Sequence, residues 1–175
     1  FGEGWSGGPL TEAMRAQALK QQSDFHFPIP WTSLGEYLEH LQQLGITPNI
    51  ASFVGATTVR IHELGEDDVA PTPEQLSRMQ DLVRAAMREG ALGVGASLIY
   101  PPAFFAKTDE LVALAQAAAE SGGGYVAHMR SEADQFLPAL EETITIARAT
   151  GQHAEAYHLK AAGARNWPKM AQAIA

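Results

Sequence analysis

Hydrophobic residues in the second half of the chain recur at helical spacing, and short apolar runs separate these stretches. The first stretch carries a capping signal, because Thr72 can act as the N-cap, Pro73 suits the first helical position and Gln75 lies three residues after the cap. Its apolar residues predict a helix that ends at Gly90. The small apolar run over residues 91–96 then predicts a buried strand.

The same order of helix and strand repeats along the rest of the chain. Thr108 can cap a second helix, which the glycines at 122–124 end, and residues 125–128 predict the next strand. A third helix around residues 137–147 is followed by a strand that closes at residues 155–158. The three strands lie about thirty residues apart, which is the spacing of successive βα units. Parallel strands joined by crossover helices are therefore expected.

The first half of the chain is less regular. An amphipathic helix over residues 34–41 and a strand over residues 50–54 are expected there, whereas residues 5–32, which contain several prolines, predict a long ordered loop. With one more strand expected just before Glu3, the chain offers at most five strand ends, fewer than a closed eight-stranded barrel needs. We therefore predict the α/β class and part of a (β/α)8 TIM-like barrel, from about its second to its sixth strand, with both ends missing.

Composition narrows the classes of function. Hydrophobic residues make up 46% of the 175 positions, which is enough for a core, so wholesale disorder is not expected. A net charge of −8 argues against a nucleic-acid partner, and no apolar run reaches the ~18 residues of a membrane span. The absence of cysteine excludes disulfides and thiolate metal ligands. Because the chain opens with Phe1 rather than Met, we expect it to start inside a longer gene product or after a cleavage. The sequence leaves the compartment open, with the cytoplasm as the expectation.

Two histidines stand at the ends of consecutive predicted strands. His128 closes the strand over residues 125–128, and His158 closes the strand over residues 155–158. Active sites of parallel α/β folds collect at the carboxyl ends of strands, and neutral imidazole is the commonest metal ligand. The two side chains could share one metal ion. Alternatively, each histidine forms only a hydrogen bond at the end of its strand.

Two further candidates lie beside glycine or proline. Glu3 stands between Gly2 and Gly4, which let the backbone bend sharply near a ligand, and its carboxylate could bridge two cations. The alternative for Glu3 is an ordinary surface acid. Tyr100 precedes two prolines, which would fix the loop and aim the phenol, although the ring could equally pack over the rim of the sheet.

Charged residues follow each histidine at alternating positions. Lys160 lies two residues beyond His158, so in a continuing strand both side chains would point to one face and the ammonium could hold an anionic group of a substrate. A solvated lysine is the alternative. Arg130 and Glu132 follow His128 with the same alternation and are expected to pair with each other. That pair could support the site from behind or form an ion pair with no further role.

Five short segments, in order along the whole chain, are similar to those of one enzyme family. They resemble the N-acyl-D-amino-acid deacylases, the D-aminoacylase branch of the amidohydrolase superfamily. Each segment alone has little specificity, and the ordered set carries the resemblance. The segments are Phe1-Gly-Glu-Gly-Trp-Ser6, Ala51-Ser-Phe-Val-Gly-Ala-Thr-Thr-Val-Arg60, Tyr100-Pro-Pro, His128-Met-Arg-Ser-Glu132 and His158-Leu-Lys-Ala-Ala-Gly163.

The resemblance implies a fold, a reaction and a cofactor. The fold is a distorted (β/α)8 barrel with a small β-sandwich, and residues 1–175 would be the central part of the catalytic barrel. The reaction is hydrolysis of the amide of an N-acyl-D-amino acid to a carboxylate and a D-amino acid, with one or two Zn²⁺ ions. The ions would polarise the amide and activate water, and an aspartate would move the proton.

The resemblance also assigns residues. His128 and His158 match the metal-binding histidines of consecutive strands. Glu3 falls where D-aminoacylase has a bridging cysteine and other superfamily members have a carboxylated lysine or a glutamate. Tyr100 and Lys160 match positions that hold the α-carboxylate of the substrate. The family's early His-x-His pair is expected upstream of this chain and its catalytic aspartate downstream, so the segment alone should have little hydrolase activity.

Other functions compete with this one. A related amidohydrolase could act on cyclic amides or dipeptides, although Tyr100 and Lys160 favour a substrate with a free carboxylate. From a different class, the chain could be a catalytically inactive fragment whose exposed sheet edges drive self-association into a homo-oligomer. The expected partner is a small molecule, with neither nucleic acid nor membrane involved.

Overall fold

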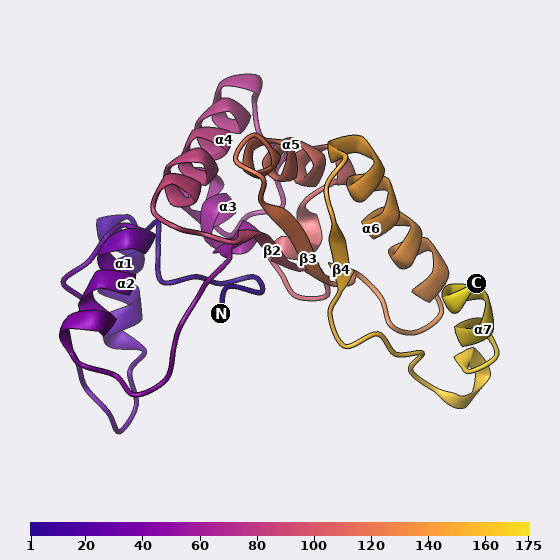
Figure 1. Cartoon of the computed structure of the whole chain (residues 1–175), viewed down its shortest axis with the longest axis horizontal. Helices are drawn as coiled ribbons and strands as arrows, with labels where there is room; N and C mark the ends of the chain where they lie inside the picture. Colours follow the sequence, from indigo (N-terminus) through magenta and orange to yellow (C-terminus); the bar gives the residue numbers. More distant parts are fainter.

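A four-stranded parallel sheet runs through the centre of the molecule, and helices connect its strands (Figure 1). The structure is a computed structural model and describes residues 1–175. The strands lie in the order β1-β2-β3-β4, so each crossover joins neighbours in the sheet. The elements are α1 (Glu12–Lys20), α2 (Leu34–Gln43), β1 (Val54–Gly55), α3 (Ala56–Leu64), α4 (Pro73–Arg88), β2 (Gly93–Ser97), the 3-10 helix η1 (Ala103–Phe105), α5 (Thr108–Ala119), β3 (Gly124–His128), α6 (Phe136–Thr150), β4 (Ala154–Ala156), the 3-10 helix η2 (Ala164–Asn166) and α7 (Lys169–Ile174).

The parallel arrangement confirms the α/β class predicted from the repeating pattern of helix and strand. In register, β2 and β3 pair from Gly93 with Gly124 to Ser97 with His128. Helices α4, α5 and α6 cover one side of the sheet, and their apolar faces build the core against it (Figure 1). Fully buried members of this core include Val54, Met79, Val83, Val94, Leu111, Leu114 and Ile146.

The helix predicted from the capping signal is confirmed as α4. The hydroxyl of Thr72 accepts from the backbone N–H of Gln75, and the side chain of Gln75 accepts from the backbone N–H of Thr72. The cap predicted at Thr108 is wrong. Lys107 holds the cap position of α5, and the hydroxyl of Thr108 instead donates to Glu142 at 2.8 Å.

The first half departs further from the predictions. Residues 5–32 are not a continuous loop, because they contain α1, which Thr11 caps. None of the side chains of α1 is buried, so no apolar stripe marked it in the sequence. The strand expected over residues 50–54 contributes only the first residue of the two-residue strand β1, and Phe1 and Gly2 are not part of a strand.

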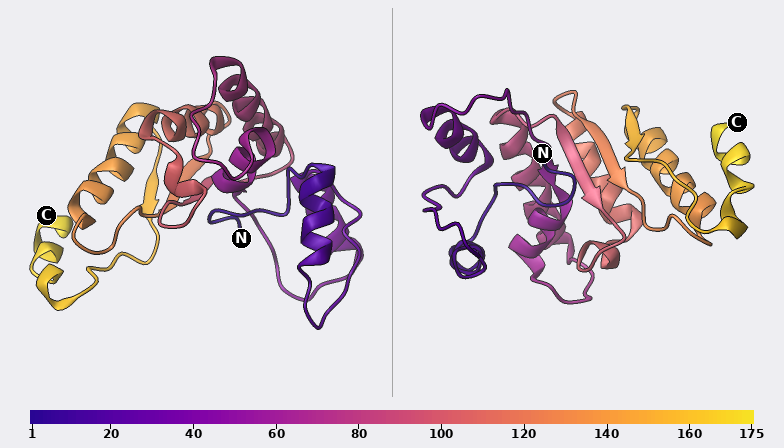
Figure 2. Two further views of the ribbon diagram at one scale, coloured as in Figure 1. Left: turned by 180° about the vertical axis from the view of Figure 1, so that it is seen from behind. Right: turned by 90° about the horizontal axis from the view of Figure 1, so that it is seen from below.

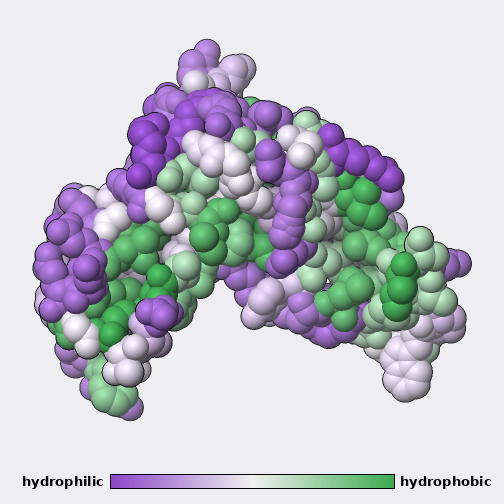
Figure 3. Space-filling model, in the orientation of Figure 1, coloured by the Kyte–Doolittle hydropathy of each residue, from purple (hydrophilic) through white to green (hydrophobic).

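The molecule as a whole arches. Helices α1 and α2 form an arm at one end and α6 and α7 lie at the other, as the views from the front and from behind show (Figures 1 and 2). Hydrophobic residues gather along the concave lower edge, whereas hydrophilic residues cover the upper edge (Figure 3). No helix combines the length and the apolar character that crossing a bilayer requires.

A buried ion pair ties α3 to α5. The guanidinium of Arg60 donates to the carboxylate of Glu110 at 2.7 Å, and the two side chains are only 1% and 5% exposed. Arg60 also donates to the backbone carbonyls of Val69 at 2.6 Å and Asp67 at 3.3 Å. One side chain therefore joins two helices and the loop between α3 and α4.

Candidate metal centre

The N-terminal segment lies directly against the sheet and carries Glu3 to its centre. The amino group of Phe1 donates to the carbonyl of Ala51 at 3.1 Å, and the carbonyl of Phe1 accepts from the backbone N–H of Phe53 at 2.8 Å. A Cβ atom on Gly95 of β2 would lie 2.0 Å from the carbonyl oxygen of Gly2, so only glycine allows this approach. The view from below shows the segment beside β2 (Figure 2).

The segment is held on its other side by the start of α3. Two backbone N–H groups at the N-terminus of this helix, from Thr57 and Thr58, donate to the carbonyl oxygen of Gly4 at 3.1 and 3.4 Å. The hydroxyl of Thr58 accepts from the backbone N–H of Ser6 at 2.9 Å, and the hydroxyl of Ser6 accepts from that of Gly55 at 2.9 Å. Two of the segments that carry the family resemblance, residues 1–6 and 51–60, therefore fix each other in space.

Glu3 meets both predicted histidines. Its Oε1 lies 3.1 Å from Nδ1 of His128 and 4.0 Å from Nε2 of His158. The two imidazole rings stand edge to face, with centroids 4.3 Å apart. One ligand atom from each of the three residues lies within 4.8 Å of the others, which is a spacing that one metal ion could bridge.

The residues of this cluster fit a zinc ion. A carboxylate and two imidazoles are the oxygen and nitrogen donors that Zn²⁺ takes from proteins, and each presents an atom to the same small space. His128 ends β3 and is buried, whereas His158 is more open. The backbone of His158 has φ of 40°, a left-handed conformation that a non-glycine residue rarely adopts.

His158 and Lys160 are not related by a strand. The strand predicted over residues 155–158 ends at Ala156, and a turn follows. The alternation that was expected to place the two side chains on one face does not apply, because residues 157–160 lie outside the strand and begin with a turn. They meet through the turn instead, with Nζ of Lys160 3.1 Å from Nδ1 of His158.

The predicted pair between Arg130 and Glu132 does not form. Arg130 binds Glu142 of α6 through two contacts of 3.0 Å and donates to the carbonyls of Phe104 and Ala106 at 2.6 and 2.7 Å. Arg130 therefore supports the loop that follows Tyr100 and forms no hydrogen bond with either histidine. Two carbonyls and a carboxylate outcompete Glu132, since a guanidinium has donors for all of them at once.

Glu132 turns toward the histidines, so it adjoins the site as one of the two alternatives from the sequence had it, but with the histidines and Lys160 as partners in place of Arg130. Its Oε1 lies 3.2 Å from Nε2 of His128 and 3.2 Å from Nδ1 of His158, and it forms an ion pair with Lys160. The signal in the sequence was the spacing of His128 and Glu132, four residues apart across a strand end. The side chain of Glu132 is 12% exposed, so this carboxylate is largely withdrawn from water.

Tyr100 completes the surroundings of the cluster. Its ring packs edge to face against that of His128, with centroids 5.4 Å apart, while the residue is 57% exposed. Tyr100 thus adjoins one histidine, and Lys160 adjoins the other.

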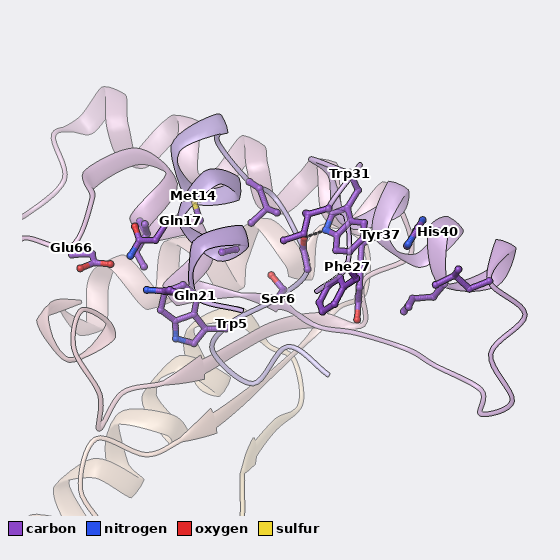
Figure 4. Close-up of a pocket in the computed structure, with 17 residues that line it drawn as sticks. Trp5, Ser6, Met14, Gln17, Gln21, Phe27, Trp31, Tyr37, His40 and Glu66 are labelled. Carbon is purple, nitrogen blue, oxygen red and sulfur yellow. Dashed lines mark hydrogen bonds between the residues drawn. The ribbon is translucent and has the colours of Figure 1, made fainter. Parts of the chain in front are cut away.

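A separate cavity lies on the other side of the N-terminal segment, between α1 and α2. It measures about 460 Å³, and most of its lining residues are hydrophobic. Figure 4 shows the aromatic side chains of Trp5, Phe27, Trp31 and Tyr37 around it, with Glu66 and Gln17 at one side. Neither Glu3 nor His128 nor His158 lines this cavity, so it is not part of the candidate metal centre.

The sequence of the chain is similar to those of known deacylases. Over 139 residues the chain is 32% identical to a D-aminoacylase of Alcaligenes xylosoxydans xylosoxydans, covering 79% of this chain and 29% of that protein. Over 152 residues it is 34% identical to an N-acyl-D-aspartate deacylase of the same organism, covering 85% of this chain and 30% of that protein. The chain is a homologue of the D-aminoacylases. No family model matches it.

Solved structures agree with this relationship to the D-aminoacylases. An N-acyl-D-glutamate deacylase from Bordetella bronchiseptica, complexed with zinc and a phosphonate mimic of the tetrahedral intermediate, superposes with a TM-score of 0.86 at 29% identity. The match covers 99% of this chain and 36% of that one. A D-aminoacylase with a binuclear metal centre gives a TM-score of 0.85 at 28% identity, covering 98% of this chain and 36% of that one. The chain therefore spans about a third of the length of the relatives that it matches.

Proposed function

We propose that the chain is the central, metal-binding part of a (β/α)8 barrel hydrolase that cleaves the amide of N-acyl-D-amino acids. The parallel sheet supports this architecture, because His128 ends β3 and His158 follows β4, at the carboxyl ends of the strands, where barrel enzymes hold their active sites, and Glu3 meets them there. The homology to D-aminoacylases supports the reaction class. The domain assignment, residues 1–175 as the middle of the catalytic barrel, is part of this proposal.

One observation carries the proposal: a carboxylate stands where two imidazoles converge. Glu3, His128 and His158 would hold one or two Zn²⁺ ions. When bound, zinc polarises an amide carbonyl and lowers the pKa of water toward about 7. Glu3 can serve two cations because a carboxylate offers two oxygens.

Tyr100 and Lys160 would bind the α-carboxylate of the substrate. The phenol can donate one hydrogen bond, and the ammonium supplies a positive charge next to His158. Both side chains are at least half exposed, so they can reach a ligand above the cluster. This placement favours an acyclic substrate with a free carboxylate over a cyclic amide. The general-base aspartate is expected downstream of this chain, and no residue of the chain itself is assigned that role.

Zinc content tests the proposal directly. The purified chain is dialysed against Zn²⁺ and then against metal-free buffer, and bound zinc is measured by elemental analysis. We expect about one equivalent in the wild type and in His153→Ala, since His153 pairs only with exposed Glu155, and near-total loss in His128→Ala. Equal zinc in all three proteins would refute the site.

Turnover is tested in the full-length gene product. We expect hydrolysis of N-acetyl-D-amino acids over their L-enantiomers, abolished in His158→Ala, and little or no turnover by residues 1–175 alone. A zinc-loaded full-length protein that hydrolyses neither enantiomer would refute the reaction and leave the metal site standing. Self-association through the sheet edges stays a prediction from the sequence, which light scattering after gel filtration would test.

A further inference from the structure

Glu132 occupies a fixed position between three side chains of the candidate metal centre. The residue lies in the loop after β3, and its backbone carbonyl accepts from the N–H of Ala162 at 2.6 Å, which ties this loop to the one after β4. Its Oε1 faces Nε2 of His128, Nδ1 of His158 and the ammonium of Lys160. A single oxygen therefore touches both histidines and the residue proposed to bind substrate.

The two imidazoles are thus enclosed by two carboxylates. Nδ1 of His128 and Nε2 of His158 face Glu3, while the remaining nitrogen of each ring faces Glu132. A neutral imidazole has one N–H and one lone pair, and a metal ion needs the lone pair. Which carboxylate lies on the metal side decides which nitrogen of each ring must carry the hydrogen.

The charges point to Glu3 as the metal side. The carboxylate of Glu132 is already paired with the ammonium of Lys160, so a second cation there would meet a positive charge. No lysine or arginine forms an ion pair with Glu3. A metal ion between Glu3 and the rings leaves hydrogens on Nε2 of His128 and Nδ1 of His158.

Only one acceptor is available to those two N–H groups. Nε2 of His128 is buried and has no aligned hydrogen-bond partner, although Oε1 of Glu132 lies 3.2 Å away. Nδ1 of His158 lies 3.2 Å from the same Oε1, also without hydrogen-bond alignment, and 3.1 Å from Nζ of Lys160, whose ammonium can donate to a lone pair but cannot accept. A hydrogen on Nδ1 therefore requires the ammonium to direct its own hydrogens to Glu132, with which it is already paired. Glu132 is left as the one acceptor, with its Oε1 3.2 Å from both of these ring nitrogens.

We infer that Glu132 is a positioning residue of the zinc site. It accepts hydrogen bonds from Nε2–H of His128 and Nδ1–H of His158, which holds both rings in the tautomers whose lone pairs face Glu3. The same carboxylate anchors the ammonium of Lys160 beside the cluster. This role rests on the proposed zinc site. Acceptors behind metal-binding histidines fix the ring and raise its basicity, and losing one weakens metal binding about tenfold to a hundredfold.

The zinc dissociation constant of the chain, measured by competition with a chromogenic chelator, tests the inference. Glu132→Gln removes the charge and should weaken binding by about tenfold to a hundredfold. Glu132→Asp retains the carboxylate on a shorter side chain and should recover part of the loss. Glu141→Gln is the matched control, because Glu141 pairs with Arg148 on the exposed face of α6, and its affinity should equal that of the wild type.

A spectroscopic readout separates positioning from general stability. Long-range ¹H–¹⁵N correlation spectra of the zinc-loaded wild type should show Nε2 protonated in His128 and Nδ1 protonated in His158. The opposite pattern would make Glu132 a ligand and overturn the inference, even if Glu132→Gln failed to fold. Zinc binding with unchanged affinity in a folded Glu132→Gln would also overturn it while leaving the zinc site intact. A wild-type chain without zinc would instead refute the site itself.

Discussion

The buried ion pair between α3 and α5 allows a quantitative test of what holds this sheet and its helices together. In the variant Arg60→Met, the carboxylate of Glu110, 5% exposed, loses the only residue with which it forms an ion pair. The hydrogen bonds to the carbonyls of Val69 and Asp67 are lost as well. Removing one partner of a buried pair costs about 3–5 kcal/mol, because the other charge stays buried without compensation. We expect a loss of about 4 kcal/mol in the free energy of unfolding.

Urea denaturation followed by circular dichroism measures this loss. With an m-value of about 2 kcal/mol/M, the midpoint should fall by about 2 M. Arg148→Met is the matched control, since Arg148 and Glu141 are 72% and 60% exposed, and exposed pairs contribute about 0–1 kcal/mol. The double variant Arg60→Met with Glu110→Leu should regain most of the loss, because apolar residues can replace a buried pair. Equal midpoints for Arg60→Met and Arg148→Met would refute the reasoning.

The pH dependence of the same variant provides a second check. Burial raises the pKa of Glu110, and Arg60 acts against this rise, so Arg60→Met raises that pKa further. A carboxyl with a raised pKa in the folded state binds a proton more tightly there than in the unfolded chain. Its contribution to stability is therefore complete below the unfolded pKa and is lost as the pH rises through the folded pKa. The deficit of Arg60→Met should be larger at pH 8 than at pH 5, and an equal deficit at both would contradict this sign.

Three further outcomes are expected. Zinc at a hundred times its dissociation constant should stabilise the chain by about 2.7 kcal/mol and raise its melting temperature by roughly 5–10 °C, and a chelator should reverse the shift; no shift in differential scanning calorimetry would count against the site. Gly95→Ala should weaken zinc binding, because its Cβ would lie 2.0 Å from the carbonyl oxygen of Gly2 and displace Glu3; an unchanged dissociation constant would show that the segment can adapt. Tyr125→Phe should leave stability unchanged or raise it by up to about 1 kcal/mol, since the buried hydroxyl has no hydrogen-bond partner; a loss of more than 1 kcal/mol in urea denaturation would show that the hydroxyl is satisfied.

The second half of the fold could be predicted because each element buries one face. Helices α4, α5 and α6 lie against the sheet, so their apolar residues recur at helical spacing and the runs between them are small and apolar. The first half could not be predicted in the same way. Helix α1 has no buried side chain, and β1 has only two residues, Val54 and Gly55, so neither leaves a periodic signal. The periodicity of hydrophobic residues reflects burial, so elements that bury few side chains cannot be detected from it.

The candidate site shows a different limit. His128 could be placed at the end of a strand because β3 is regular up to that residue, and its approach to Glu3 is consistent with the order of the family segments. The partner of Arg130 could not be predicted by alternation, because the period of two holds only inside a strand and β3 ends at His128. Beyond His128, the acceptors within reach of the guanidinium determine the partners of Arg130.

The choice between these acceptors has a consequence for the chemistry. Arg130 has donors for two carbonyls and a carboxylate at once, and η1 with α6 offers such a set at 2.6–3.0 Å. Because Arg130 pairs with Glu142, Glu132 has no arginine partner. Its carboxylate faces the histidines and forms an ion pair with Lys160. Had the predicted pair with Arg130 formed, the guanidinium would have competed with the rings and with Lys160 for the lone pairs of Glu132. The contacts of Glu132 with the rings and with Lys160, and not only the identities of Glu3, His128 and His158, therefore help to set which ring nitrogens face Glu3.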